Sequence, residues 1–260
     1  MRILFIYIMV AIVLLTGCTK PVAPKDDPIV IVEPTEIEVS NETLTQEEQD
    51  NILKEFYNKL NNKISEEEII KYLDENISKL DSVKVDDIII ELDEHLRLYN
   101  QNFESNVNTL MKYYEYSTDE IKSYLEVLDK EAKKMFTDGE EIKIELKELL
   151  DRAILAENHL KKYPEGKTQK RVQELYSAYI EGAIIGTGNQ FIYAEDSSST
   201  VKKEVLDTYK SFVEINKDSN VTKIISNYLE VLSLDNNDMN GENTLKFYEN
   251  ISNIINENIK

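Results

Sequence analysis

From residue 45 onward, hydrophobic residues recur every three or four positions, which is the spacing of one face of an α-helix. Two long stretches of this kind, 85–114 and 142–163, contain neither glycine nor proline. The first predicts either one helix of about 30 residues or two collinear helices broken at 100–102. Within it, residues 83–92 include three consecutive isoleucines and also fit a short strand, so both alternatives stay open there. The second predicts a helix that begins after Gly139 and ends before Pro164.

Signals for the starts of helices support the same reading. Thr45, Ser65 and Ser117 are each followed three positions later by a glutamate, which is the pattern of a capping box. Ile64 and Ile69 flank the second of these and are spaced as a hydrophobic staple. Strand signals are sparse by comparison, so the sequence predicts an all-α fold.

The last third of the chain contains a possible internal repeat. At an offset of 53 positions, hydrophobic residues of 160–179 align with those of 213–232, and 163–166 and 216–219 become equivalent turns between helices. This pattern resembles the tetratricopeptide-type helix pairs of bacterial envelope proteins over about 75 residues, without the Trp and Leu-Gly positions of that repeat. The resemblance implies antiparallel helix pairs. We therefore expect a helical bundle or a short array of such pairs.

The N-terminal segment has the pattern of a secretion signal. Arg2 precedes an unbroken apolar run at 3–15, which as a helix is about 20 Å long and shorter than the roughly 30 Å hydrocarbon core of a bilayer. Leu15, Thr16, Gly17 and Cys18 follow, and they resemble the bacterial lipobox, in which the cysteine is diacylated and the preceding segment is removed. The resemblance implies that Cys18 anchors the chain by lipid to the extracytoplasmic face of the cell membrane. An ordinary signal peptide with an incidental cysteine is the alternative.

Residues 19–44 are typical of a linker. Four of the five prolines of the chain lie there, and residues 19–50 carry nine acidic side chains against two lysines. The predicted organisation is a signal peptide at 1–17 and a lipidated N-terminus with an acidic, proline-rich, disordered linker at 18–44. A bundle of long helices at 45–164 then follows, with C-terminal helix pairs at 165–260 packed on it.

Composition restricts the chemistry. The chain has 260 residues and a formal charge of −20, which argues against nucleic acid as a partner because phosphate binding needs a cationic face. A single cysteine excludes a disulfide within the chain and a site of several thiolates. We predict no catalytic residues, no metal site and no cofactor, and we do not expect an enzyme.

Two possible metal sites fit less well than their structural alternatives. Glu91 and His95 are one helical turn apart, but Leu92 and Tyr99 beside them favour a histidine that borders the core. Residues 236–241 match the first half of a calcium loop, but its twelfth position is Phe247 instead of a glutamate, which favours a plain turn.

Four aromatic residues are the candidates for binding a partner. Phe191 and Tyr193 lie in a connection of roughly 13 residues, a length that is often functional. Tyr113 and Tyr116 lie off the hydrophobic face to which Tyr114 belongs, so they are candidates to stack on sugar rings or to contact protein. The structural alternatives are an aromatic plug at a helix end for the first pair and ordinary half-buried tyrosines for the second.

The combined prediction is a lipid-anchored, extracytoplasmic helical interaction or scaffold protein of the bacterial cell envelope, with a protein or cell-wall partner. The alternative is an acidic lipoprotein that binds a cationic peptide or a metal ion. A cell-wall enzyme is a third class, for which the chain offers no concentrated set of catalytic groups.

Overall fold

The computed structural model describes residues 44–186 and 199–259, and these are all-α, as predicted. The described part contains no strand and only two isolated β-bridges, Thr137 with Ile142 and Thr200 with Asp238. Its helices are α1 (Gln46–Asn61), α2 (Glu66–Asn76), η1 (Ile77–Lys79), α3 (Ser82–Tyr99), α4 (Phe103–Met111), η2 (Tyr114–Tyr116), α5 (Asp119–Lys133), α6 (Leu146–Lys162), α7 (Gln169–Ile184), α8 (Lys203–Ile215), α9 (Asn220–Leu234), α10 (Glu242–Glu249) and α11 (Ile251–Ile259).

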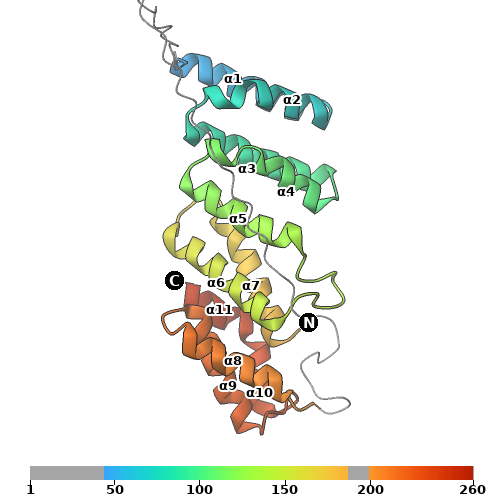
Figure 1. Ribbon diagram of the computed structural model, residues 1–260, viewed down its shortest axis with the longest axis vertical. Coiled ribbons are helices and arrows are strands. Elements are labelled where there is room, and N and C mark those ends of the chain that lie inside the picture. The colour runs from blue at the N-terminus through green and yellow to red at the C-terminus, as the bar shows by residue number, and fades with distance from the viewer. Residues whose placement is uncertain (1–43, 187–198, 260) are drawn as a thin grey trace, which may run out of the picture. The chain divides into compact units, whose positions relative to one another are not determined.

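The helices form an array in which most helices pack against a neighbour in sequence, while α11 packs back against α6 and α7 (Figure 1). Short turns join α1 to α2, α6 to α7 and α8 to α9, and the two helices of each pair pack against each other, so each pair is antiparallel. Further contacts join α1 to α3, α5 to α6, and α6 to α8 and α9. Each helix therefore buries its apolar face between its own partner and the next layer.

The stretch 85–114 forms two helices that fold back on each other. Residues 83–92 belong to α3, so the strand alternative is wrong, and α3 and α4 are separated at 100–102, as one alternative predicted. The two helices are not collinear, because α4 packs against α3. The side chain of Asn102 accepts a hydrogen bond from the Ser105 amide at 3.0 Å and so begins the new helix at the break.

The three expected capping boxes have different outcomes. Thr45 forms the complete box with Glu48, and the Ser65 hydroxyl accepts a hydrogen bond from the Glu68 amide at 3.4 Å. The third is wrong, because α5 begins one residue later, with Thr118 as its N-cap and no cap from its own side chain. The carboxylate of Asp86, on α3, instead accepts from the Thr118 amide at 2.9 Å and from its hydroxyl at 2.7 Å.

Such caps from a distant helix recur along the array, and we call them the capping contacts. In each, the acceptor lies on an earlier helix and satisfies the backbone at or next to the start of a later one. The pairs are Gln49 with Asp81, Asp86 with Thr118, Glu120 with Thr168, and Glu157 with Ser219, Asn220 and Val221. The capping contacts fix the starts of α3, α5, α7 and α9 against the preceding layers.

The C-terminal helices form the predicted order of helix, turn and helix. The turns expected at 163–166 and 216–219 lie between α6 and α7 and between α8 and α9. The expected division at 164/165 falls between α6 and α7, which pack closely within one compact unit that holds all the described helices. Ala153, Tyr176 and Ile225 are fully buried in the core shared by both parts.

Candidate functional site

The tyrosines at 113–116 are arranged differently from the prediction. Tyr113 is only 2% exposed, and its hydroxyl donates to Asp74 on α2 at 3.0 Å, so its assignment to a partner-binding surface is wrong. Burial and this carboxylate raise the pKa of Tyr113. Tyr114 is half-buried, and Tyr116 is 43% exposed. The reason is that α4 ends at Met111, so the helical periodicity that placed these rings does not extend to them.

The remaining predicted site residues lie outside the described part of the chain. Phe191 and Tyr193 belong to 187–198, and Leu15, Thr16, Gly17 and Cys18 belong to 1–43. Their roles in partner binding, signal cleavage and lipidation stay predictions. Among the described helices, none is long and apolar enough to cross a membrane.

His95 lines a pocket of about 290 Å³ at the turn between α1 and α2. Its ring lies 4.7 Å from that of Tyr99, and Glu66 and Ile64 complete the wall. Burial lowers the pKa of His95, and the nearby Glu66 carboxylate opposes this effect. Across the described residues, no group of three His, Cys, Asp or Glu side chains is placed to hold a metal ion.

Two aspartates at the Asn-rich turn 236–241, Asp235 and Asp238, accept hydrogen bonds from within the turn and from the start of α10. The carboxylate of Asp235 accepts from the Thr244 amide at 2.7 Å and from Asn243 Nδ2 at 2.7 Å, and Asp238 accepts from the Asn240 amide at 2.8 Å. Asn236 and Asn237 adopt positive φ angles, which asparagine tolerates better than most residues. These contacts build the turn that leads from α9 into α10.

His159 joins three helices through a buried hydrogen-bonded chain. Its Nδ1 lies 3.1 Å from the Ser123 hydroxyl of α5, and its Nε2 lies 2.9 Å from the Thr168 hydroxyl before α7. The Thr168 hydroxyl donates to Glu120 at 3.1 Å, so Nε2 carries the proton and Nδ1 accepts from Ser123. The ring is 1% exposed, so this chain is a structural tie between α5, α6 and α7 instead of a nucleophile with its base.

The pH dependence of stability follows from this burial. Desolvation lowers the pKa of His159, so the folded protein holds the ring neutral at pH values where the unfolded chain takes up a proton. We expect the contribution of His159 to be complete above the unfolded pKa of about 6.5 and to decline as the pH falls below it. Urea unfolding at pH 7.5 and 5.5 measures this. His159→Gln should show a smaller difference between the two pH values than the natural chain, and an equal difference would contradict the assignment.

A buried ion pair between Arg152 and Glu131 also holds α5 against α6. Arg152 of α6 donates from Nη1 to Glu131 of α5 at 2.7 Å, and both side chains are almost completely buried. Glu131 also accepts from the Phe136 amide at 2.7 Å and from the Tyr179 hydroxyl at 3.1 Å. Arg152 reaches Glu148 through Nη2 at 2.6 Å. All of these partners are internal, so the cluster organises the core and offers no open catalytic position.

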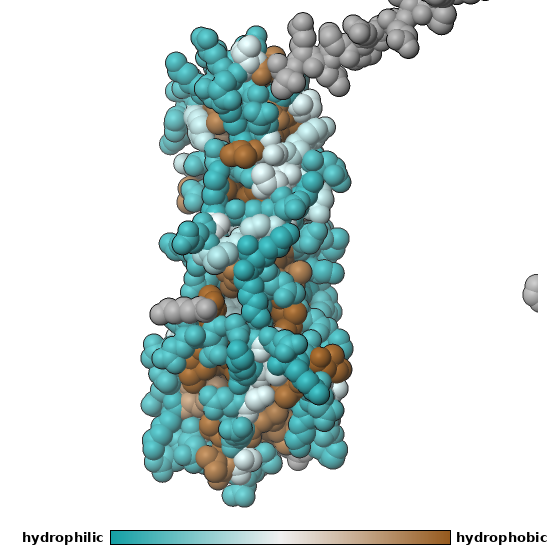
Figure 2. All heavy atoms as spheres, turned by 90° about the vertical axis from the view of Figure 1, so that its left-hand side faces the viewer, coloured by the Kyte–Doolittle hydropathy of each residue, from teal (hydrophilic) through white to brown (hydrophobic). Residues whose placement is uncertain are grey.

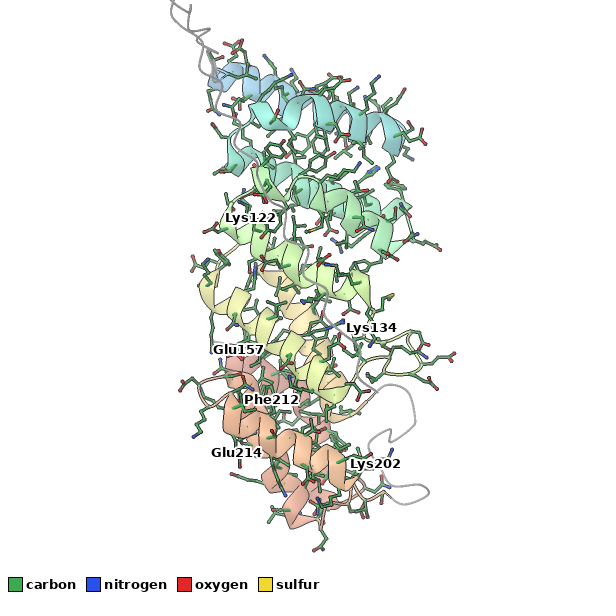
Figure 3. The ribbon with its side chains drawn as sticks, in the orientation of Figure 1. Lys122, Lys134, Glu157, Lys202, Phe212 and Glu214 are labelled. Atoms are coloured by element: carbon green, nitrogen blue, oxygen red, sulfur yellow. The ribbon has the colours of Figure 1, made fainter. Side chains whose placement is uncertain are left out.

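The described surface offers an apolar groove between α6 and α8, which we call the α6–α8 groove. Its volume is about 350 Å³. Phe212 lies at its base, nearly buried, whereas Ile215 at the C-terminal end of α8 is 73% exposed. Figure 3 labels Phe212 and Glu214 in the C-terminal part of α8 and Lys202 just before its start. The other lining residues are Lys147, Asp151, Asp207, Thr208, Ser211 and Asn216.

The surface around this part of the array is also unusually apolar. Figure 2 shows hydrophobic side chains gathered over the lower half of the viewed face, at the level where Figure 1 has α8 to α11. Leu234, at the end of α9, is a further large hydrophobic side chain that is mostly exposed. Ile215 is the large exposed hydrophobic side chain that lines the α6–α8 groove, and exposed apolar side chains at a groove are typical of protein contact sites.

The α6–α8 groove was not predicted from the sequence, because Ile215 comes directly after hydrophobic residues of the buried face of α8 and so resembles a member of that face. Phe212 and Val213 belong to that face, and Ile215 lies two positions beyond it, where a polar residue would be expected on a solvent-facing turn. That break in the pattern is the available signal. Comparison with protein-family models, with curated proteins and with solved structures finds no match to this chain.

Proposed function

We propose that this chain is a lipid-anchored protein of the bacterial cell envelope that binds a protein partner through its helical array. The lipobox-like residues at 15–18 motivate the anchor, and the acidic, proline-rich segment after them is suited to hold the array away from an anionic bilayer surface. Two acyl chains are enough for stable anchoring, whereas one chain is marginal.

The observation that carries the binding role is the α6–α8 groove. Its exposed isoleucine above a buried phenylalanine forms an apolar site with a charged rim, contributed by Lys147, Asp151 and Asp207. Partners bind such sites by inserting an apolar side chain, while the rim contributes specificity. The polar groups buried in the described core are largely committed to internal contacts, which favours a binding protein over an enzyme.

The acidic alternative, binding of a cationic peptide or a metal ion, has less support. The carboxylates most completely buried in the described part cap helices or pair with arginine, and no described cluster is arranged for a metal. No further observation favours this second function.

Photo-crosslinking in cells tests both parts of the proposal. A photoreactive benzoylphenylalanine at position 215 should give a discrete cross-linked product in the membrane fraction, because this position reaches into the groove. In Cys18→Ala the protein should lose lipid labelling and leave the mature membrane-bound fraction, with a loss of most of the cross-linked product.

Position 203, on the same helix, provides the matched control. Lys203 is 83% exposed in its side chain and pairs only with Asp207, so the same photoreactive residue there should give no product of that size. Equal products from 203 and 215 would contradict the groove as the binding site. Lipid-labelled, membrane-bound Cys18→Ala would contradict the anchor.

A further inference from the structure

A third pocket, on α3, α5 and α7, is lined by one more cationic than acidic side chain, in a chain that is acidic overall. Its volume is about 230 Å³. Four cationic side chains line it, Arg97 from α3, Lys167 just before α7, and Lys170 and Arg171 from the first turn of α7, together with the carboxylates of Asp93, Glu94 and Glu174. The chain as a whole has a formal charge of −20 and only four arginines, two of which lie here. Such a concentration of cations in an acidic protein needs a physical explanation.

The arginines have donors left over after their internal contacts. Arg97 uses Nε towards Asp93 at 3.2 Å, and Arg171 uses Nη1 towards Glu174 at 3.3 Å. The Nε of Arg171 is inaccessible to solvent and has no hydrogen-bond partner among the described residues. Each guanidinium carries five N–H donors, so both retain several for a ligand.

The two lysines differ in whether a carboxylate already pairs with them. Lys167 pairs with Asp87 at 2.5 Å, so its charge is already compensated. Lys170 makes no ion pair within the part of the chain that the structure describes, and its side chain is exposed at the pocket. Lys170 and Arg171 also lie in the first turn of α7, where the partial positive charge of the helix N-terminus adds to their own.

Both arginines converge on the floor of the pocket. The Tyr124 hydroxyl donates to Asp93 at 2.6 Å, and both side chains are buried. Tyr124 lines this pocket together with Arg97 and Arg171. Burial and the Asp93 carboxylate raise the pKa of Tyr124, while the charges of Arg171 and Arg97 oppose this effect. The single Asp93 carboxylate is shared by Tyr124 and Arg97, and it leaves Arg171 without an anion at the floor.

We propose that this pocket binds the oxyanion of a small ligand, a phosphate or carboxylate group, between Arg97, Lys170 and Arg171. Guanidinium groups match both oxyanions because their paired N–H donors fit two oxygens. Asp93, Glu94 and Glu174 also line the pocket and repel anions, although Asp93 pairs with Arg97 and Glu174 with Arg171. The ligand is therefore small and carries its charge at one end, where it reaches the cations. This site is separate from the α6–α8 groove, with which it shares no lining residue.

Titration calorimetry on the detergent-solubilised full chain tests the proposal, with inorganic phosphate and succinate as separate probes and sodium chloride at matched ionic strength as the reference. At least one probe should bind with a heat absent from the chloride titration. Arg171→Gln should weaken that binding at least about tenfold, the effect of losing a charged hydrogen bond. Binding of phosphate only, or of succinate only, identifies which oxyanion the site takes.

Lys170→Gln provides a second variant that disturbs no internal ion pair and should also weaken binding. The control is Lys133→Gln, which removes the same charge from an exposed side chain of α5 outside the pocket and should bind as the natural chain does. Thermal unfolding verifies that each variant is folded. The proposal is overturned if neither probe binds above chloride, or if Arg171→Gln and Lys133→Gln bind equally well.

Discussion

Replacement of Arg152 by alanine is expected to lower the free energy of unfolding by about 3–5 kcal/mol, because it leaves the Glu131 carboxylate buried without its cation. Arg152 Nη1 lies 2.7 Å from Glu131, and the exposed fraction of both side chains is below one tenth. The hydrogen bonds from the Phe136 amide and the Tyr179 hydroxyl then remain as the only compensation for the charge. Urea unfolding followed by circular dichroism at pH 7 measures the change.

Two further variants make this expectation specific to the buried charge. Arg152→Met combined with Glu131→Gln removes both charges, and the glutamine keeps an acceptor oxygen for the Phe136 amide while its NH2 group can donate to the Tyr179 hydroxyl. This double variant should therefore regain at least half of the lost stability. Lys147→Ala removes an exposed cation on the same helix, paired with Asp151 at 2.6 Å, and should change stability by about 1 kcal/mol or less. A loss below about 1 kcal/mol in Arg152→Ala would show that the pair does not hold α5 against α6.

Glu157→Ala is expected to lower the free energy of unfolding by about 2–4 kcal/mol, since three donors at the start of α9 lose their acceptor. The Glu157 carboxylate of α6 accepts from the Ser219 hydroxyl at 2.5 Å, the Asn220 amide at 2.8 Å and the Val221 amide at 3.2 Å. Glu157→Gln keeps one acceptor oxygen and should lose less. Urea unfolding gives the global change, and hydrogen exchange should show the amides of α9 to be the most affected.

The same carboxylate predicts a pH dependence. Burial alone raises the pKa of Glu157, but hydrogen bonds from Lys161, from Ser219 and from the two backbone amides outweigh it and hold the pKa below its usual value. Its contribution is therefore complete above the unfolded pKa of about 4.3 and is lost as the pH falls through the lower folded value.

The matched control for Glu157 is Asp151→Ala, a carboxylate on the same helix that is about half exposed and pairs only with Lys147. It should leave both global stability and the exchange of α9 nearly unchanged. Equal exchange of α9 in Glu157→Ala and in Asp151→Ala would show that the carboxylate is not the cap of this helix.

The sequence by itself determined the fold class and most of the helix positions. Hydrophobic spacing of three and four residues along 45–259 specifies which faces are buried, and local caps such as Thr45 with Glu48 fix a helix start without help from the rest of the chain. The equivalent turns at 163–166 and 216–219 could also be predicted from the sequence, because polar or helix-breaking residues between two periodic stretches favour a turn.

Tertiary structure alone decided which polar groups cap which helices and where the pockets lie. The start of α5 looked like a local box at Ser117, but Asp86 from 32 residues earlier takes the role, because a buried N–H must find an acceptor and the stacked α3 supplies one. Tyr113 was a candidate for contact with a partner and is buried, because α4 ends at Met111 and the helical periodicity does not extend to this residue. Arg97 and Arg171 are 74 positions apart in the sequence, and only the stacking of α3, α5 and α7 brings their charges to one pocket.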